Sequence, residues 1–77
     1  MVSAYILIQT EVGKSTQVTR ESRDITGVVS VDDVTGPYDV IVRAEAGDLD
    51  QLAKAVVLRI QEVEGVTRTL TCPILKI

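Results

Sequence analysis

The fold is decided by two nine-residue stretches, YILIQTEVG at residues 5–13 and DVIVRAEAG at residues 39–47. Each stretch begins with an apolar, partly β-branched run that is typical of a strand, and each ends in a glycine. A more polar, helix-like segment follows each glycine. A Gly-Val pair at residues 27–28 or 65–66 then opens another strand-like run. The chain therefore predicts the same strand–helix–strand unit twice.

The predicted elements follow from this repeat. Strands are expected at residues 3–11, 27–34, 38–46 and 66–75, and helices at residues 13–24 and 48–64. This order predicts a single α+β domain over residues 1–77 with a ferredoxin-like βαββαβ sandwich, in which two helices cover one face of a four-stranded antiparallel sheet. Pro73 has no backbone N–H to donate, so the last strand is expected at a sheet edge.

The second helix has the clearer signal. Asp48 is a suitable N-cap, and Gln51 three residues later completes a capping-box pattern. Apolar residues then recur at helical spacing: Leu49, Leu52, Ala53, Val56, Ile60 and Val63. The first helix has only Val18 and Ile25 with the small Ser22 between them, so we expect it to bury a narrow face.

Alternation along the strands predicts what each face of the sheet carries. In the first strand Ala4, Ile6 and Ile8 share one face, and Tyr5 and Leu7 share the other. In the last strand we expect the apolar set to meet the helices and the threonines to lie on the open face. The apolar set is Val66, Leu70, Cys72 and Ile74, and the threonines are Thr67, Thr69 and Thr71. An open face that still carries apolar residues predicts a homodimer that packs sheet against sheet.

Composition limits the possible functions. The chain has 77 residues, a formal net charge of −3, no histidine and one cysteine. Cys72 cannot form an internal disulfide, and without histidine an ordinary zinc site is excluded, which indicates a reduced, cytoplasmic location and a structural thiol. Scattered Lys and Arg argue against direct nucleic-acid binding, and the longest uncharged stretch is too short to span a membrane. We expect no cofactor and no metal, and we expect oligomerisation because so small a domain has little core.

Few residues are suited to catalysis. Asp32 and Asp33 come nearest to a carboxylate pair, but adjacent residues of a strand point to opposite faces. No serine or cysteine has an evident base, and the glycines stand alone instead of forming a phosphate loop. We therefore predict no catalytic residues and no enzyme activity.

A ligand site is better supported at the turn before the third strand. This turn contains five residues suited to binding: Thr35, Gly36, Pro37, Tyr38 and Asp39. Backbone N–H groups at such a turn can hold a carboxylate, and Asp39 can hold an ammonium group. The hydroxyls of Thr69 and Thr71 could add hydrogen bonds, so the set would suit a free α-amino acid. An ordinary turn and strand-forming threonines explain the same spacing.

These residues resemble the effector domain of the leucine-responsive/asparagine-regulator (Lrp/AsnC) family, also called the RAM domain. The resemblance rests on residues 4–8, 13–14, 34–39 and 65–66, followed by Thr69 and Thr71. It implies a ferredoxin-like fold, a dimer formed through the sheets, and assembly of dimers into rings or discs such as octamers or decamers. It also implies that an amino-acid effector binds between dimers at the seven residues named above.

Full-length members of the family carry an N-terminal helix-turn-helix domain, whereas this chain begins at its first strand. Met1 directly before that strand favours a stand-alone module. We predict a stand-alone amino-acid sensor that shifts its own assembly, or that of a full-length helix-turn-helix regulator with which it mixes. The alternatives are a ligand-independent oligomerisation or interaction scaffold, a small ferredoxin-like dimeric enzyme of the monooxygenase type, and an ACT-type regulatory domain.

Overall fold

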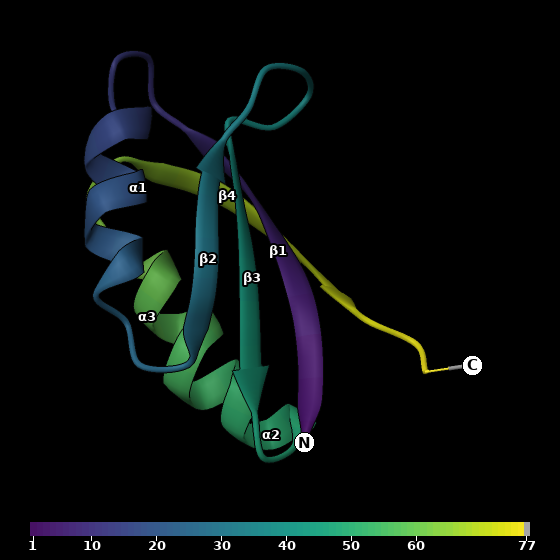
Figure 1. Cartoon of the computed structure of the whole chain (residues 1–77). Coiled ribbons are helices and arrows are strands. Elements are labelled where there is room, and N and C mark those ends of the chain that lie inside the picture. Colours follow the sequence, from purple (N-terminus) through teal and green to yellow (C-terminus); the bar gives the residue numbers. More distant parts are fainter. Residues whose placement is uncertain (77) are drawn as a thin grey trace.

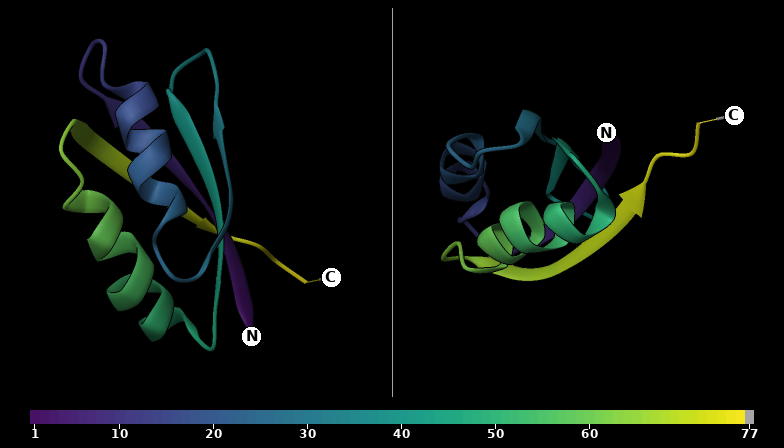
Figure 2. Two further views of the ribbon diagram at one scale, coloured as in Figure 1. Left: turned by 60° about the vertical axis from the view of Figure 1, so that its left-hand side comes forward. Right: turned by 90° about the horizontal axis from the view of Figure 1, so that it is seen from below.

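A computed structural model describes residues 1–76. The strands are β1 (Val2–Thr10), β2 (Val28–Asp33), β3 (Val40–Ala46) and β4 (Val66–Pro73). The helices are α1 (Ser15–Arg23) and a second, continuous helix made of α2 (Leu49–Gln51), η1 (Leu52–Val57) and α3 (Leu58–Gln61). The sheet is antiparallel with the order β2-β3-β1-β4, and both helices cover one of its faces (Figures 1 and 2). The predicted ferredoxin-like fold is confirmed.

The core lies between the helices and the sheet. Its buried residues are Ala4, Ile6, Ile8, Val18, Val31, Val40, Val42, Ala44, Leu52, Val56 and Ile60. The alternate residues of β1 and β3 contribute six of these, as the period of two predicts. In α1, Val18 and Ser22 are fully buried, which confirms the narrow inward face. Within residues 1–76, no helix has the length and apolar character needed to cross a membrane.

The predicted faces of β4 are wrong. β4 lies at the sheet edge, as Pro73 predicts, but Thr69 pairs with Ile8, whose side chain is buried under the helices. Thr69 therefore lies on the helix side, and Gln61 in α3 donates a hydrogen bond of 3.0 Å to its hydroxyl. Leu70 and Cys72 lie on the open face instead, and Cys72 is an exposed free thiol, so it is not part of the core.

A β-bulge explains this reversal. Arg68 pairs with Gln9, but Val66 pairs with Thr10, so Thr67 is an extra residue in β4. One extra residue changes the phase of the alternation and moves every following side chain to the other face. Val66 itself still packs against the core, as predicted. The simple alternation therefore fails only after the bulge.

The second helix begins as predicted, but only part of its expected apolar stripe is buried. The carboxylate of Asp48 accepts a hydrogen bond of 2.8 Å from the Gln51 backbone N–H, which confirms the N-cap. Leu49 and Ala53, expected in the buried stripe, are exposed. Leu52, Val56 and Ile60 are buried as expected. Residues 52–57 form a π-helix, which has more residues per turn than an α-helix.

Candidate functional site

The predicted binding turn lies in the hairpin between β2 and β3. This loop extends past the end of the sheet, at the same end of the molecule as the β1–α1 loop (Figure 1). Val34 N–H donates to the Asp39 carbonyl at 2.9 Å and closes the loop. Gly36 has a φ of 140°, and a side-chain carbon placed there would meet no atom within 4 Å. The tip of the hairpin is therefore open to solvent, with Thr35, Gly36 and Pro37 exposed.

Hydrogen bonds to the end of β1 hold the hairpin in place. One carboxylate oxygen of Asp39 accepts bonds from the Thr10 backbone N–H at 2.8 Å and from the Thr10 hydroxyl at 3.3 Å. Asp39 N–H donates to the Ile8 carbonyl, and the Gln9 side chain donates to the Pro37 carbonyl, each at 2.9 Å. Asp39 thus anchors the hairpin through one oxygen and leaves the other without a hydrogen bond to residues 1–76.

Thr69 and Thr71 do not join the hairpin within one chain. They lie on β4, which is separated from β3 by β1. Two strand spacings correspond to about 10 Å. Both hydroxyls are half-buried on the helix side, whereas the hairpin tip projects beyond the end of the sheet. The seven predicted site residues therefore form two separate groups.

Two residues that hold the hairpin in place were not predicted from the sequence. Gln9 and Thr10 hold the hairpin, but they are 28 and 29 residues away from their partners in the sequence. Only the pairing of β1 with β3 brings them close. No local pattern marks such long-range contacts. The signal that could have found them is the expected sheet order itself, which places the end of β1 beside the start of β3.

The carboxylates of β2 do not converge. Asp32 pairs with Ile41 on the open face, while Asp33 lies on the helix side and accepts a hydrogen bond from the Thr19 hydroxyl. The prediction that they point to opposite faces is confirmed. Within residues 1–76, no group of three or more His, Cys, Asp or Glu is placed to hold a metal ion.

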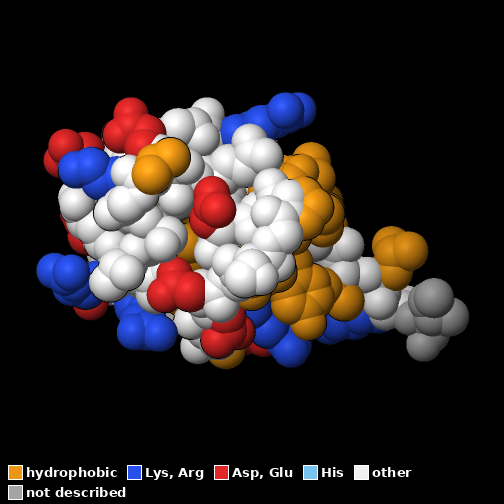
Figure 3. Space-filling view, turned by 90° about the horizontal axis from the view of Figure 1, so that it is seen from above, with side chains coloured by type: hydrophobic (Ala, Val, Ile, Leu, Met, Phe, Trp, Pro, Cys, Tyr) orange, Lys and Arg blue, Asp and Glu red, His pale blue; other side chains and the backbone are white. Residues whose placement is uncertain are grey.

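The open face of the sheet carries an apolar patch, which we call the open-face patch: Tyr5, Leu7, Ile41, Leu70 and Cys72. Leu7 lies between Ile41 and Leu70 across three neighbouring strands, and Tyr5 lies next to Cys72. Tyr5 and Leu70 are 42% and 48% exposed. Seen from the hairpin end, hydrophobic side chains gather on the side away from α1, whereas charged side chains are scattered over the rest of the view (Figure 3).

The fold and this arrangement can be compared with known proteins. The family model described as the Lrp/AsnC ligand binding domain matches residues 3–77. The chain belongs to this family. TTHA0845 from Thermus thermophilus matches with a TM-score of 0.92 and 28% identity, over 100% of this chain and 96% of that one.

Two further solved structures share the fold at lower identity. Escherichia coli AsnC matches 97% of this chain and 51% of its own, with a TM-score of 0.88 and 18% identity. A transcriptional regulator of Neisseria meningitidis, NMB0573, was solved in complex with L-Met. It matches 97% of this chain and 50% of its own, with a TM-score of 0.76 and 19% identity.

A segment of the same kind occurs in enzymes. Homocitrate synthases of Sulfurisphaera tokodaii and Sulfolobus acidocaldarius are 40% and 42% identical to this chain over 62 residues. The match covers 80% of this chain and 13% of each enzyme. This chain is thus similar to a small part of these enzymes.

Proposed function

We propose that this chain is an effector-sensing regulatory module that binds a small amino acid at the hairpin end of the sheet. The observation that carries the proposal is the anchored hairpin. Asp39 and Pro37 are fixed to β1, while Gly36 leaves the turn backbone open to solvent. A fixed turn loses little conformational entropy on binding, and its free N–H groups suit a carboxylate. Membership of a ligand-binding family and the L-Met complex of NMB0573 support an amino acid as the ligand.

Assembly of several subunits would bring Thr69 and Thr71 to the ligand site. Because Thr69 and Thr71 lie two strands away from β3, we propose that they complete the site from another subunit. The open-face patch would form the dimer interface, since apolar patches on small domains commonly mark subunit contacts. Dimers would then join into a ring of eight or ten subunits. Ligand would favour the assembly in which the site is complete.

The module has two candidate partners. One is a full-length helix-turn-helix regulator, because the structural match to this chain covers 51% of the length of AsnC. The other is an enzyme of the homocitrate synthase type, in which a segment 40–42% identical to this chain is built in. The higher identity is the specific observation in favour of this second candidate. In both cases the module would bind the effector, and the activity of the partner would change in response.

We propose that the chain itself is not an enzyme and that it works in the cytoplasm. The split between Asp32 and Asp33 supports the first statement, because the two carboxylates cannot act on one substrate from opposite faces. A single exposed thiol supports the second, because such a thiol stays reduced there. If no effector binds, the chain would instead act as a ligand-independent oligomerisation scaffold.

The test is a thermal-shift screen of the wild-type chain against each proteinogenic amino acid. Ligand at about 100 times its dissociation constant should add about 2.7 kcal/mol to the free energy of unfolding. A stabilising amino acid supports the sensor. A uniform null result, with a stable oligomer throughout, would replace it with the scaffold. Native mass spectrometry of the chain mixed with each candidate partner then decides which of the two forms a mixed assembly.

A further inference from the structure

A groove lies on the helix side of the molecule, away from every predicted site residue. Its larger part has a volume of about 430 Å³ and runs between α1 with its following turn and the second helix. A second hollow of about 310 Å³ adjoins it, because both are lined by Thr26, Lys54 and Ala55. Cavities of a few hundred Å³ are the size that small ligands occupy. The groove is therefore large enough for a metabolite.

Small residues and an unusual helix line this groove. Ala55 contributes only a methyl group to its wall. Gly27 brings the start of β2 close to the second helix, since a side-chain carbon there would lie 2.9 Å from Val56. Lys54, Ala55 and Val56 all belong to the π-helical segment η1, in which Leu58 N–H donates to the carbonyl of Ala53. π-helical turns are rare and often occur at functional sites.

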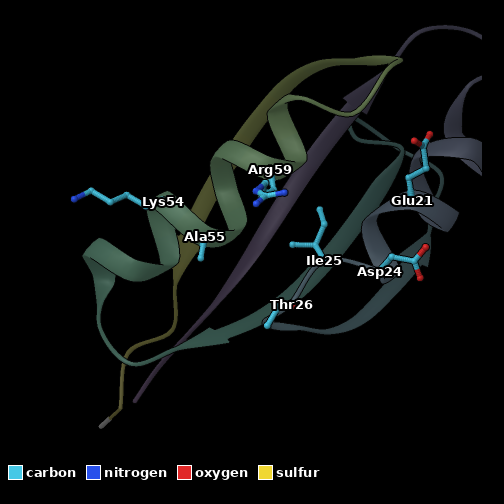
Figure 4. A pocket seen from close by; sticks show the side chains of 7 residues that line it. All are labelled: Glu21, Asp24, Ile25, Thr26, Lys54, Ala55 and Arg59. Carbon is cyan, nitrogen blue, oxygen red and sulfur yellow. The ribbon is translucent and has the colours of Figure 1, made fainter.

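The two sides of the groove carry opposite charges. Glu21 and Asp24 lie on the α1 side with their carboxylates turned away from Arg59, which lies on the second helix (Figure 4). Ile25 lies between the two helices. Lys54 lines the groove near its backbone, but its ammonium group extends away from the groove and forms an ion pair of 3.1 Å with Asp50. In the part of the chain that the structure describes, Arg59 has no ion-pair partner within 4.0 Å. Its guanidinium is thus available to a carboxylate.

These features define the chemistry of a ligand. Arg59 favours a carboxylate, and Ile25 with Ala55 favours an apolar group. The carboxylates of Glu21 and Asp24 repel a simple anion and attract a cation within the screening length of about 8–10 Å. We propose that this groove binds a small zwitterion with an apolar side chain, with its carboxylate at Arg59 and its ammonium group toward α1. This site is separate from the hairpin and does not depend on it.

The test follows methyl NMR signals of the assembled wild-type chain during a titration with L-leucine up to about 20 mM, well above the ~1 mM expected for a shallow site. The methyl signals of Ile25 and Ala55 should shift as L-leucine is added and should reach a plateau when the site is saturated. 4-Methylpentanoate, which lacks the ammonium group, and 3-methylbutylamine, which lacks the carboxylate, should each shift them less at equal concentration. The Val34 methyl signals report on the hairpin in the same spectra, so the two sites are read separately.

Two pairs of variants test the residues. Ala55→Leu fills the groove, whereas Ala53→Leu adds the same bulk at an exposed position of the same helix that does not line it. Ala55→Leu should abolish the Ile25 shift and Ala53→Leu should keep it. Arg59→Gln should weaken binding by about three- to tenfold, the effect of an exposed charge-assisted hydrogen bond, and Arg20→Gln on α1 should not.

Several results would overturn the inference. These are the absence of shifts at Ile25 and Ala55, equal shifts with the two singly charged analogues, or unchanged affinity in Arg59→Gln. Shifts confined to Val34 would reject the groove and leave the hairpin site standing. Shifts confined to the groove would do the reverse. If Ala55→Leu fails to fold, the Arg59→Gln and Arg20→Gln pair still decides the question.

Discussion

Asp39 and Thr10 form a double hydrogen bond that joins the hairpin to the end of β1. One carboxylate oxygen accepts both the backbone N–H, at 2.8 Å, and the hydroxyl, at 3.3 Å. The two residues are 29 positions apart in the chain, and both are half-buried. This contact fixes the start of β3 relative to β1. It also sets the position of the proposed ligand site, because Gly36 and Pro37 lie only three and two residues before Asp39.

The first prediction concerns this contact. Asp39→Ala should lower the free energy of unfolding by about 1–3 kcal/mol, because the Thr10 N–H loses its partner. Thr10→Ala should cost less, since it removes only the longer hydroxyl bond and keeps the N–H bond. Urea denaturation of both variants measures the difference. An equal or larger loss in Thr10→Ala would show that the backbone bond is not the main contribution.

The second prediction concerns the open-face patch. Leu70→Glu should shift the dimer toward monomer by about tenfold or more in dissociation constant, because a charge would be buried in an apolar interface. Leu58→Glu is the matched control, since Leu58 is 53% exposed and Leu70 is 48% exposed, but Leu58 lies on the second helix. Sedimentation velocity reports the oligomeric state. Equal effects of the two variants would place the interface elsewhere.

The third prediction uses the only cysteine of the chain. Cys72 is exposed in the single chain and lies beside Tyr5 in the open-face patch. Sheet-to-sheet packing should therefore protect its thiol from a colorimetric thiol reagent. The reaction should be slow in the assembled wild type and fast in Leu70→Glu. A fast reaction in an assembled wild type would contradict a dimer through this face.

The fourth prediction concerns the start of the second helix. Asp48→Ala should lower the free energy of unfolding by about 1 kcal/mol, because the Gln51 N–H loses its cap. Asp50→Ala removes only the surface pair with Lys54, in which both side chains are 72% exposed, so its cost should stay within about 0.5 kcal/mol. Thermal denaturation followed by circular dichroism compares the two. A larger loss for Asp50→Ala would contradict the capping role.

Much of the fold could be predicted because local pattern and tertiary structure agree. The alternation Ala4, Ile6, Ile8 in β1 and the buried stripe Leu52, Val56, Ile60 in the second helix both survive in the structure. The prediction for β4 failed because a single extra residue, Thr67, changes the phase of the side-chain alternation. The local sequence has no pattern that indicates this bulge. Strand alternation is reliable only between such irregularities.

The candidate site could be predicted only in part. The turn residues Thr35 to Asp39 are contiguous, and Gly and Pro mark them. Their supports, Gln9 and Thr10, come from another strand, and the groove at Arg59 arises from the packing of two helices. Such features depend on how helices and strands pack against one another. The periodicity of hydrophobic residues along the chain does not specify this packing. The predicted set of seven residues combined two groups that one chain keeps apart.

The most direct test of the central claim is isothermal titration calorimetry with the amino acid that stabilises the chain most. We expect saturable binding to the wild type and an affinity about tenfold weaker or more in Gly36→Ala, because a side chain at the hairpin tip narrows the site and strains a φ of 140°. Gly13→Ala is the control, since Gly13 also has a positive φ of 81° and open surroundings but lies outside the hairpin. It should bind like the wild type. Equal affinity in all three proteins would contradict binding at the hairpin.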